Sequence, residues 1–512
     1  MFFVDNGSSP AHLRGCTHQY GFFCMSASIF SRFGTTAALA GSALLAGCAT
    51  APNLGPEPQV RAPSAFAAER SLAADPAASW PAERWWTAYR DPQLARLIDE
   101  ALAGAPDLAA AAARVRAAEA VARQAGAARL PSVDARGSVS AVKQSYNNLI
   151  PEPFVPKGVR DTGELALDLG LDLDLWGRNR AALAAATSQA EAERLEQAEA
   201  ALVLSTNIAA AYADLARFHA TRRVQQDAVT VRERTARLVA DRVAAGLDTQ
   251  AEARQSAATV PAARADLAAT DEQIALTRNR IASLMGQGPD RGLQIAPPAA
   301  SVATRGLPPG VTTDLIGRRP DIVAARARVE AAASRIKVAR ADFYPSVNLS
   351  ALVGLQSFGL NRLVDSGSTF LNAGPAVSLP IFRGGRLQGQ YREARAGYDE
   401  AVADYDRAVA DAFRDVADAV TSQRALGVRL SESRQALLDS EAAYSVARQR
   451  FEGGLSTFLD VLTAEDRVLQ ARRIVADLDS RAFALDVALV RALGGGFSPP
   501  SLTQASKDQS RG

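Results

Sequence analysis

Two acidic residues stand at matching positions in two similar stretches of the chain. Residues 242–254 read RVAAGLDTQAEAR and contain Glu252, and residues 450–462 read RFEGGLSTFLDVL and contain Asp460. In both stretches a Gly-Leu pair comes first, and a threonine lies three residues before the acid. This spacing is typical of a capping box at the start of a helix.

A cysteine follows a short apolar segment near the N-terminus. Residues 33–47 are apolar or small over a length typical of a signal peptide, and residues 45–48 read LAGC. This ending resembles a bacterial lipobox. We therefore expect cleavage before Cys48 and acylation of its sulfur and its new amine. Several acyl chains on one residue give a stable membrane anchor.

The residues around this cysteine predict how the precursor is processed and sorted. Ala49 stands where an aspartate would indicate retention in the inner membrane, so we expect sorting to the outer membrane. A signal peptide that begins at Met25 has the expected length. Residues 1–47 are therefore interpreted as an upstream mis-start, residues 1–24, followed by a lipoprotein signal peptide.

The composition argues against several classes of protein. The 512 residues include 57 basic and 55 acidic side chains, a balance that gives no indication of nucleic-acid binding. After residue 24 the chain has one histidine, His219, and one cysteine, Cys48. These leave no set of ligands for zinc and no Ser-His or Cys-His pair. We expect no enzyme activity, no metal and no cofactor other than the covalent lipid.

The chain is a duplication of one unit of about 200 residues. Residues 105–133 align with 319–347, and the sequence LWGRNR at 175–180 corresponds to IFRGGR at 381–386. The acidic stretches described above keep nearly the same offset. Three matches in the same order predict two copies of one structural unit.

Each copy changes from helical to strand periodicity and back. A helix is expected first, then two strands of membrane-crossing length, then a helix of more than 60 residues and a shorter return helix. The expected strands are 131–142 and 164–176, then 346–356 and 371–382. The expected long helices are 178–245 and 386–452, and the return helices are 249–286 and 457–493.

These elements divide the chain into consecutive segments. Residues 48–104 form a lipidated extended segment with the first short helices, and 105–286 form the first repeat. A Gly/Pro-rich linker at 287–318 leads to the second repeat at 319–496, and 497–512 form a disordered tail. Four strands cannot close a barrel, and open sheet edges are not tolerated in lipid, so strands that span a membrane require several protomers.

The second expected strand has two chemically different faces. Leucines at alternate positions from Leu165 to Leu175 would meet lipid. Asp168, Asp172 and Asp174 would then face the lumen and form anionic rings that favour cations. A generic polar lining explains the same residues without selectivity.

Six motifs spread over residues 48–496 resemble the TolC-type outer-membrane factors, specifically the NodT-like efflux lipoproteins. The motifs are CATAPNLGPEP, RWWTAYRDPQLARLIDEAL, DLIGRRPDIVAARARV, ADFYPSVNLS, LPIFRGGR and FEGGLSTFLDVLTAEDRVL. The resemblance implies a mixed, mainly α fold and a homotrimer in the outer membrane of a Gram-negative bacterium. Its twelve-stranded transmembrane β-barrel, four strands per protomer, continues into a twelve-helix periplasmic α-barrel with a partly irregular equatorial region.

The resemblance also implies a function and partners. Such a protein is a passive exit duct of a tripartite efflux pump. It binds a periplasmic adaptor and works with an inner-membrane pump, here expected to be of the RND type. A type I protein-secretion duct and a non-transporting envelope scaffold are alternatives. The exported substrate stays open.

The family's functional sites map onto the two acidic stretches. The resemblance implies that Glu252 and Asp460 are gate acids, although Thr463 stands where some relatives have a second acid. Helix capping explains the same two acids without a transport role, and one acid can serve in both roles. The Gly-Leu turns match the adaptor-docking tips and comprise Gly246, Leu247, Gly454 and Leu455. A buried leucine that joins the two helices of each hairpin is the alternative explanation of these turns.

Overall fold

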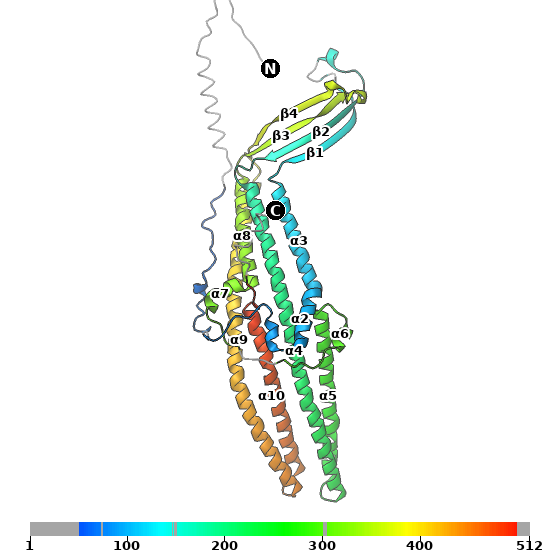
Figure 1. Cartoon of the computed structure of the whole chain (residues 1–512), viewed down its shortest axis with the longest axis vertical. Coiled ribbons are helices and arrows are strands. Elements are labelled where there is room, and N and C mark those ends of the chain that lie inside the picture. The colour runs from blue at the N-terminus through cyan, green and yellow to red at the C-terminus, as the bar shows by residue number, and fades with distance from the viewer. Residues whose placement is uncertain (1–50, 73–74, 146, 148–150, 301–304, 499–512) are drawn as a thin grey trace, which may run out of the picture.

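The computed structural model describes residues 51–498 apart from 73–74, 146, 148–150 and 301–304. A four-stranded sheet lies at one end, long helices run away from it, and short helices form a belt around the middle (Figure 1). The turns between the long helices lie at the end farthest from the sheet.

Each half of the chain supplies the same three long helices. They match in pairs of equal length: α3 (Pro106–Ala127) and α8 (Pro320–Ala341) have 22 residues, α4 (Arg178–Ala244) and α9 (Arg386–Glu452) have 67, and α5 (Gln250–Leu284) and α10 (Phe458–Ala492) have 35. The two 67-residue helices both begin after a glycine with positive φ, Gly177 and Gly385. The observed bounds of these four long and return helices differ from the expected ones by at most two residues, and the equal lengths agree with a duplication.

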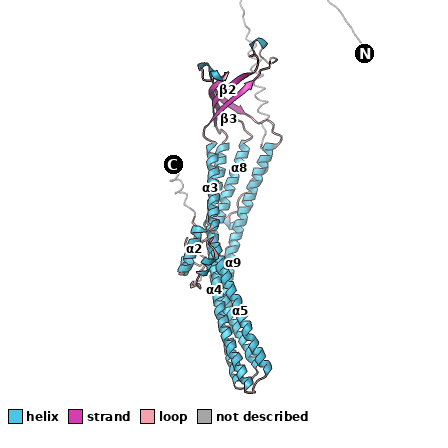
Figure 2. Ribbon diagram, turned by 90° about the vertical axis from the view of Figure 1, so that its right-hand side faces the viewer, coloured by secondary structure: helices cyan, strands magenta, loops and turns pink. Residues whose placement is uncertain are grey.

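The helices form one layer because their many small side chains allow close approach. Above the belt, α4 lies between α3 and α8, and α8 also packs against α9. Below the belt, α4 packs against α5 and α10, and the helices reach the tip as paired hairpins (Figure 2). Among the described residues, no helix combines the length and apolarity needed to cross a membrane.

The sheet joins strands from both copies. Its strands are β1 (Ser132–Val142), β2 (Arg160–Asp172), β3 (Ser346–Phe358) and β4 (Thr369–Ser378). They are antiparallel and lie in sequence order, so the central pair, β2 and β3, comes from different copies. Short 3-10 turns occupy the loops at the far end: η3 (Glu152–Phe154), η4 (Leu360–Arg362) and η5 (Ser366–Ser368).

Two strands are displaced from their expected positions. β2 begins and ends four residues earlier than the expected 164–176, and β4 ends at Ser378 rather than at residue 382. The leucine alternation continues to Leu175, but Asp174 has a φ of 44° and turns the chain toward α4. Pro380 has no N–H group for a ladder bond and therefore disfavours continuation of β4.

Each outer strand of the sheet has one edge without a neighbouring strand. Among the residues that the structure describes, β1 pairs only with β2, and β4 pairs only with β3. Unpaired edges are not tolerated in lipid. The sheet must therefore continue into the sheets of other protomers.

The belt consists of short elements that precede each repeat. They are η1 (Pro63–Phe66), η2 (Trp85–Tyr89), α2 (Pro92–Gly104), α6 (Pro289–Leu293) and α7 (Val311–Arg318). The expected linker 287–318 thus contains two short helices. Two buried polar groups fasten the belt to the long helices.

The first of these groups centres on Asp91. Its carboxylate accepts hydrogen bonds from Gln93 N (2.9 Å) and Leu94 N (3.2 Å) and so caps α2. It also accepts a bond from the Tyr212 hydroxyl of α4 (2.7 Å). Burial, followed by this bond to Asp91, raises the pKa of Tyr212.

The second group centres on Asp486 of α10, which is 2% exposed. Its Oδ2 accepts bonds from the Tyr89 hydroxyl (2.6 Å) and from Arg305 Nε (3.0 Å). Burial and the charge of Asp486 raise the pKa of Tyr89, so the hydroxyl stays protonated and donates.

Candidate functional site

The two hairpins at the tip share one backbone geometry. Gly246 and Gly454 have φ values of 71° and 72°. Leu247 N donates to Arg242 O (2.9 Å), and Leu455 N donates to the carbonyl of the corresponding arginine, residue 450 (2.7 Å). These bonds define a Schellman motif, which requires a left-handed residue after the helix and therefore favours glycine.

The leucines of both turns face solvent. Leu247 is 66% exposed and Leu455 is 72% exposed. The alternative interpretation, in which these leucines are buried between the helices, is wrong. Other residues form the apolar contact inside the tip, mainly Phe451 and Phe458, whose ring centroids lie 6.0 Å apart.

Both acids cap the helices that follow the turns. Glu252 Oε2 accepts bonds from Thr249 N (2.7 Å) and Thr249 Oγ1 (3.0 Å). Asp460 Oδ2 accepts the same two bonds from Thr457, at 3.0 and 2.9 Å. The second oxygen of each carboxylate makes no hydrogen bond with the part of the chain that the structure describes, so capping leaves it available.

An arginine holds the first hairpin against the second. Arg242 makes two hydrogen bonds to the Asp248 carboxylate, at 2.8 and 3.2 Å, and its guanidinium lies 4.4 Å from the Phe451 ring centroid. In the second copy the equivalent residues are Arg450 and Ser456, so the aspartate is missing. Within the described part of the chain, the Arg450 side chain donates to the Leu455 carbonyl alone, at 3.5 Å.

A buried ion pair lies about two turns above the second cap. Glu465 of α10 is 2% exposed and lies 3.6 Å from Arg232 Nε of α4. Arg232 also contacts Asp466 at 2.8 Å. Burial raises the pKa of Glu465. No local pattern in the sequence predicts this pair. The difference between the copies gives one signal, because Ala257 stands where the second copy has Glu465.

Asp168 lies within β2, and its neighbours on the same face are charged. Arg136 of β1 lies 3.7 Å from Asp168 and 3.3 Å from Glu164. On the other face of β2, Leu165 and Leu167 are 52% and 46% exposed. The strand therefore separates charged and apolar faces as expected, and the nearby arginine partly neutralises Asp168.

Asp172 and Asp174 lie where β2 leads into α4. Asp172 ends β2 and accepts bonds from Asp174 N (2.9 Å) and Asn179 Nδ2 (3.0 Å). The Asp174 carboxylate accepts bonds from Asn179 N (2.8 Å) and Arg180 N (3.0 Å). Placing Asp174 in the strand is therefore wrong, and its carboxylate caps a helix.

The protein combines a membrane-length sheet with open edges, a long helical body and capped tip hairpins. The family model for outer membrane efflux proteins matches residues 97–287 and 311–495. The chain belongs to the outer membrane efflux protein family.

Relatives and solved structures agree with this membership. The chain is 39% identical over 372 residues to the fusaric acid resistance protein FusA of Burkholderia cepacia, covering 70% of this chain and 69% of FusA. It is 30% identical to the pyoverdine export outer membrane protein OpmQ of Pseudomonas aeruginosa, covering 86% and 92%. The fold matches the outer membrane protein VceC of Vibrio cholerae with a TM-score of 0.78 and 44% identity, covering 82% of this chain and all of VceC.

Membership in this family establishes how the protein is oriented relative to the outer membrane and the periplasm. The sheet of this efflux protein belongs to a trimeric outer-membrane barrel with four strands from each protomer, and the helices continue it into the periplasm. The belt covers the outside of the helical layer, because it would otherwise fill the duct. The tip hairpins are the end deepest in the periplasm (Figure 1).

The expected lipid-attachment residue, Cys48, lies outside the described residues. The segment that follows it runs along α9 away from the sheet. Tyr398 donates to Pro58 O (3.1 Å), Arg395 donates to Gly55 O (3.4 Å), and Arg61 pairs with Asp406 lower on the helix (3.3 Å).

Proposed function

We propose that this efflux protein is the exit duct of a tripartite pump and receives its cargo through a periplasmic adaptor and an RND-type inner-membrane pump. The observation that carries the proposal is the pair of exposed leucines at the tip. Leu247 and Leu455 present apolar side chains on rigid turns at the periplasmic end, where a partner in the periplasm can reach them.

The cargo is small molecules, and the duct passes them without a chemical step. This part of the proposal is supported by relatives named for resistance to fusaric acid, for pyoverdine export and for solvent efflux. Their names differ in cargo while the fold is shared, which is expected if the pump and adaptor select the molecule. Asp168 and Asp172 are proposed to line the lumen at the level of the strands.

A double variant tests docking at the tip. We expect Leu247→Glu with Leu455→Glu to abolish co-purification with the adaptor and to restore drug sensitivity, because charged side chains cannot be buried against an apolar surface. Val364→Glu is the matched control, since this residue is 83% exposed in a loop at the opposite end. Full adaptor binding by the double variant would refute docking through these leucines.

Glu252 and Asp460 are proposed to act as both caps and gate acids. One oxygen of each carboxylate holds the helix start, and the other makes no hydrogen bond to a described residue. Three copies of each acid around the trimer axis would form two rings of negative charge at the narrow end. The buried Arg232–Glu465 pair keeps α10 against α4 and so positions Asp460.

Cys48 is proposed to carry the acyl chains that anchor each protomer. Gly55 lies beside Arg395, nine residues into α9, which is about 14 Å below the start of that helix. Seven residues separate Cys48 from Gly55, and an extended chain of this length spans about 24 Å. The cysteine can therefore reach the level of the sheet.

The anchor has a direct test. Cys48→Ser should abolish incorporation of radiolabelled palmitate. Ser64→Ala, in the mature chain outside the lipobox, is the control and should label fully. Undiminished labelling of the Cys48 variant would exclude this attachment site.

A further inference from the structure

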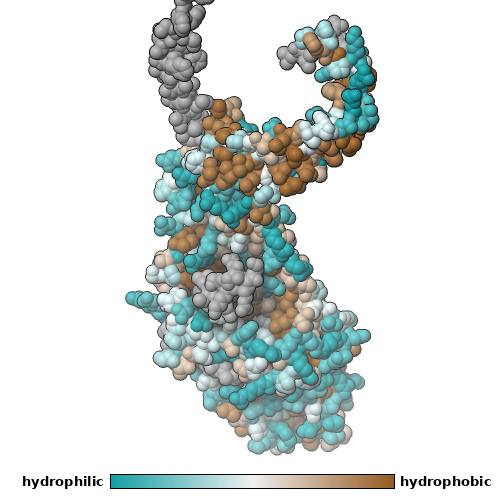
Figure 3. Space-filling view, turned by 45° about the horizontal axis from the view of Figure 1, so that its top comes forward, coloured by the Kyte–Doolittle hydropathy of each residue, from teal (hydrophilic) through white to brown (hydrophobic). Residues whose placement is uncertain are grey.

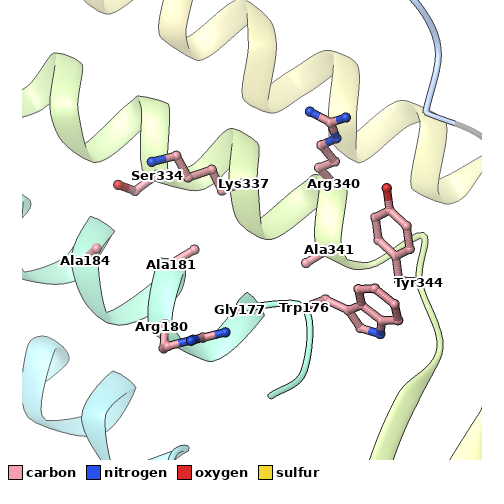
Figure 4. A pocket seen from close by; sticks show the side chains of 10 residues that line it. All are labelled: Trp176, Gly177, Arg180, Ala181, Ala184, Ser334, Lys337, Arg340, Ala341 and Tyr344. Atoms are coloured by element: carbon pink, nitrogen blue, oxygen red, sulfur yellow. The ribbon is translucent and has the colours of Figure 1, made fainter.

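A groove lies on the outer surface where the sheet meets the helices. It has a volume of about 570 Å³ and is formed between the start of α4 and the end of α8. Figure 4 shows Trp176 and Tyr344 at one end of the groove, with Arg180 on one side and Lys337 and Arg340 on the other. Alanines from both helices form its floor.

The groove faces outward. Its floor includes Ala181 of α4 and Ala341 of α8. Leu195 and Ala327 lie on the same faces of these two helices, about four turns away. Phe497 packs against the cluster that contains Leu195 and Ala327, and the preceding residue, Gly496, lies against Ala82 and Glu83 of the belt, just before η2. Because the belt covers the outside of the duct, the groove opens on the outside as well.

The groove also lies at the edge of the membrane. β2 ends at Asp172 and β3 begins at Ser346, so Trp176 and Tyr344 come directly below the strands. Hydrophobic side chains gather on the sheet and at its junction with the helices, whereas the lower helices are mostly hydrophilic (Figure 3). Membership in the family makes this junction the periplasmic surface of the outer membrane.

The aromatic pair suits such an interface. The rings of Trp176 and Tyr344 are stacked, with centroids 4.8 Å apart and planes at 22°. Both are partly exposed, at 52% and 42%, and the Trp176 indole N–H donates to Pro345 O (2.7 Å). Trp and Tyr side chains with a satisfied polar atom and an exposed ring are typical of the headgroup level.

Two of the three basic side chains that line the groove have no acidic partner among the described residues. Arg180 is paired with Asp174 at 3.3 Å. Lys337 and Arg340 make no side-chain hydrogen bond and no ion pair with any residue that the structure describes. The neighbouring acid on α8, Asp342, is already paired with Arg178 at 3.2 Å. Two positive charges therefore stay available beside an apolar floor.

We propose that this groove binds the phosphate of an inner-leaflet glycerophospholipid, with Lys337 and Arg340 contacting the phosphate and Trp176 and Tyr344 contacting the glycerol and upper acyl chains. Basic pockets at a membrane surface recognise phospholipid headgroups in this way. The volume is adequate for a headgroup, and the aromatic pair favours a lipid over free phosphate. Three such sites around the trimer would fix the depth of the barrel in the membrane.

Trp176 supplies a direct probe of the site. The other three tryptophans are Trp80, Trp85 and Trp86, all in the belt. The full-length trimer is placed in vesicles of phosphatidylcholine with increasing phosphatidylglycerol, part of which carries bromine on its acyl chains near the headgroup. We expect Trp176 fluorescence to be quenched more strongly by brominated phosphatidylglycerol than by brominated phosphatidylcholine at equal content.

The double variant Lys337→Gln with Arg340→Gln tests the cations. Each cation near an anionic lipid strengthens binding about fivefold, so we expect about a 30-fold weaker apparent affinity for phosphatidylglycerol. The control is Arg234→Gln with Arg237→Gln, the same change of charge near the tip, and it should leave quenching unchanged. The wild-type comparison of the two lipids needs no variant, so it tests the proposal even if the double variant does not fold.

Three results would overturn the proposal. The first is equal quenching of Trp176 by both lipids. The second is an equal loss of affinity in the tip control. The third is displacement of brominated phosphatidylglycerol by millimolar inorganic phosphate, which would identify a site for free phosphate. None of these results affects transport through the duct, so failure of the lipid site and failure of the duct are distinguishable.

Discussion

Substitutions of Asp460 separate its capping role from its proposed gating role. Asp460→Ala removes both bonds to Thr457, at 3.0 and 2.9 Å. At this exposed helix start, water replaces part of the loss, so we expect about 1 kcal/mol of destabilisation per protomer. Asp460→Asn keeps an acceptor oxygen in the same place. It loses only the attraction of the charge to the helix N-terminus, about 0.5 kcal/mol.

The proposed gate would depend on the charge of Asp460 rather than on its hydrogen bonds. In the trimer, either substitution removes three negative charges from the narrow end. We expect both variants to alter the single-channel conductance and cation preference in a planar bilayer, whereas only the alanine variant lowers the unfolding midpoint clearly. Thr457→Ala is the matched control, because it weakens the cap and keeps the charge. It should lower stability and conduct like the wild type.

One pattern of results would refute a gating role for Asp460. If Asp460→Asn conducts like the wild type while Asp460→Ala is only less stable, the acid serves the helix start alone. The sequence spacing of threonine and acid would then be explained completely by capping.

Three further predictions concern stability. Burial, followed by the charge of Asp321, raises the pKa of Glu199 to about 7. The contribution of Glu199 to the free energy of unfolding is therefore complete below about pH 4.5, and this contribution, about 3 kcal/mol, is lost as pH rises through 7. Glu199→Gln should remove this pH dependence in denaturant titrations at pH 5 and 8.5. Asp486→Ala removes the acceptor of Tyr89 and leaves Arg305 without its carboxylate, so guanidinium unfolding should show a loss of about 2–3 kcal/mol. Gly454→Ala should cost about 1 kcal/mol by thermal unfolding, because its φ is 72° and no atom lies near the added methyl group.

A specific result would contradict each of these three predictions. Equal pH dependence in wild type and Glu199→Gln would exclude Glu199 as the titrating group. An unfolding free energy within 0.5 kcal/mol of wild type, the usual range for an exposed substitution, would show that Asp486 does not fasten the belt. Gly453→Ala is the control for the turn, because Gly453 has a φ of −80°. A larger loss of stability in Gly453→Ala than in Gly454→Ala would contradict the Schellman geometry.

The long helices were predictable almost to the residue because local chemistry sets their ends. Gly246 and Gly454 stop the outgoing helices, and Thr249 and Thr457 start the returning ones. The ends of β2 and β4 were less predictable. Alternation of leucines continues through Leu173 and Leu175 after the strand has ended, so periodicity alone could not locate the turn at Asp174.

Contacts between distant parts of the chain could not be derived from the sequence. The Arg232–Glu465 pair and the bond from Tyr212 to Asp91 join residues more than 100 positions apart. No local spacing marks such partners. A comparison of the two copies gives a partial signal, because Glu465 and Asp248 each occur in only one of them. The groove at Trp176 and Tyr344 also depends on the packing of α4 against α8.

Conductance of the purified trimer in a planar bilayer tests the central claim most directly. The account predicts discrete channel events, small for the wild type and larger when the tip acids are neutralised together as Glu252→Gln with Asp460→Asn. The absence of any channel event in the wild type, in this double variant and in the presence of the adaptor would contradict an exit duct. The chain would then be a scaffold of the envelope.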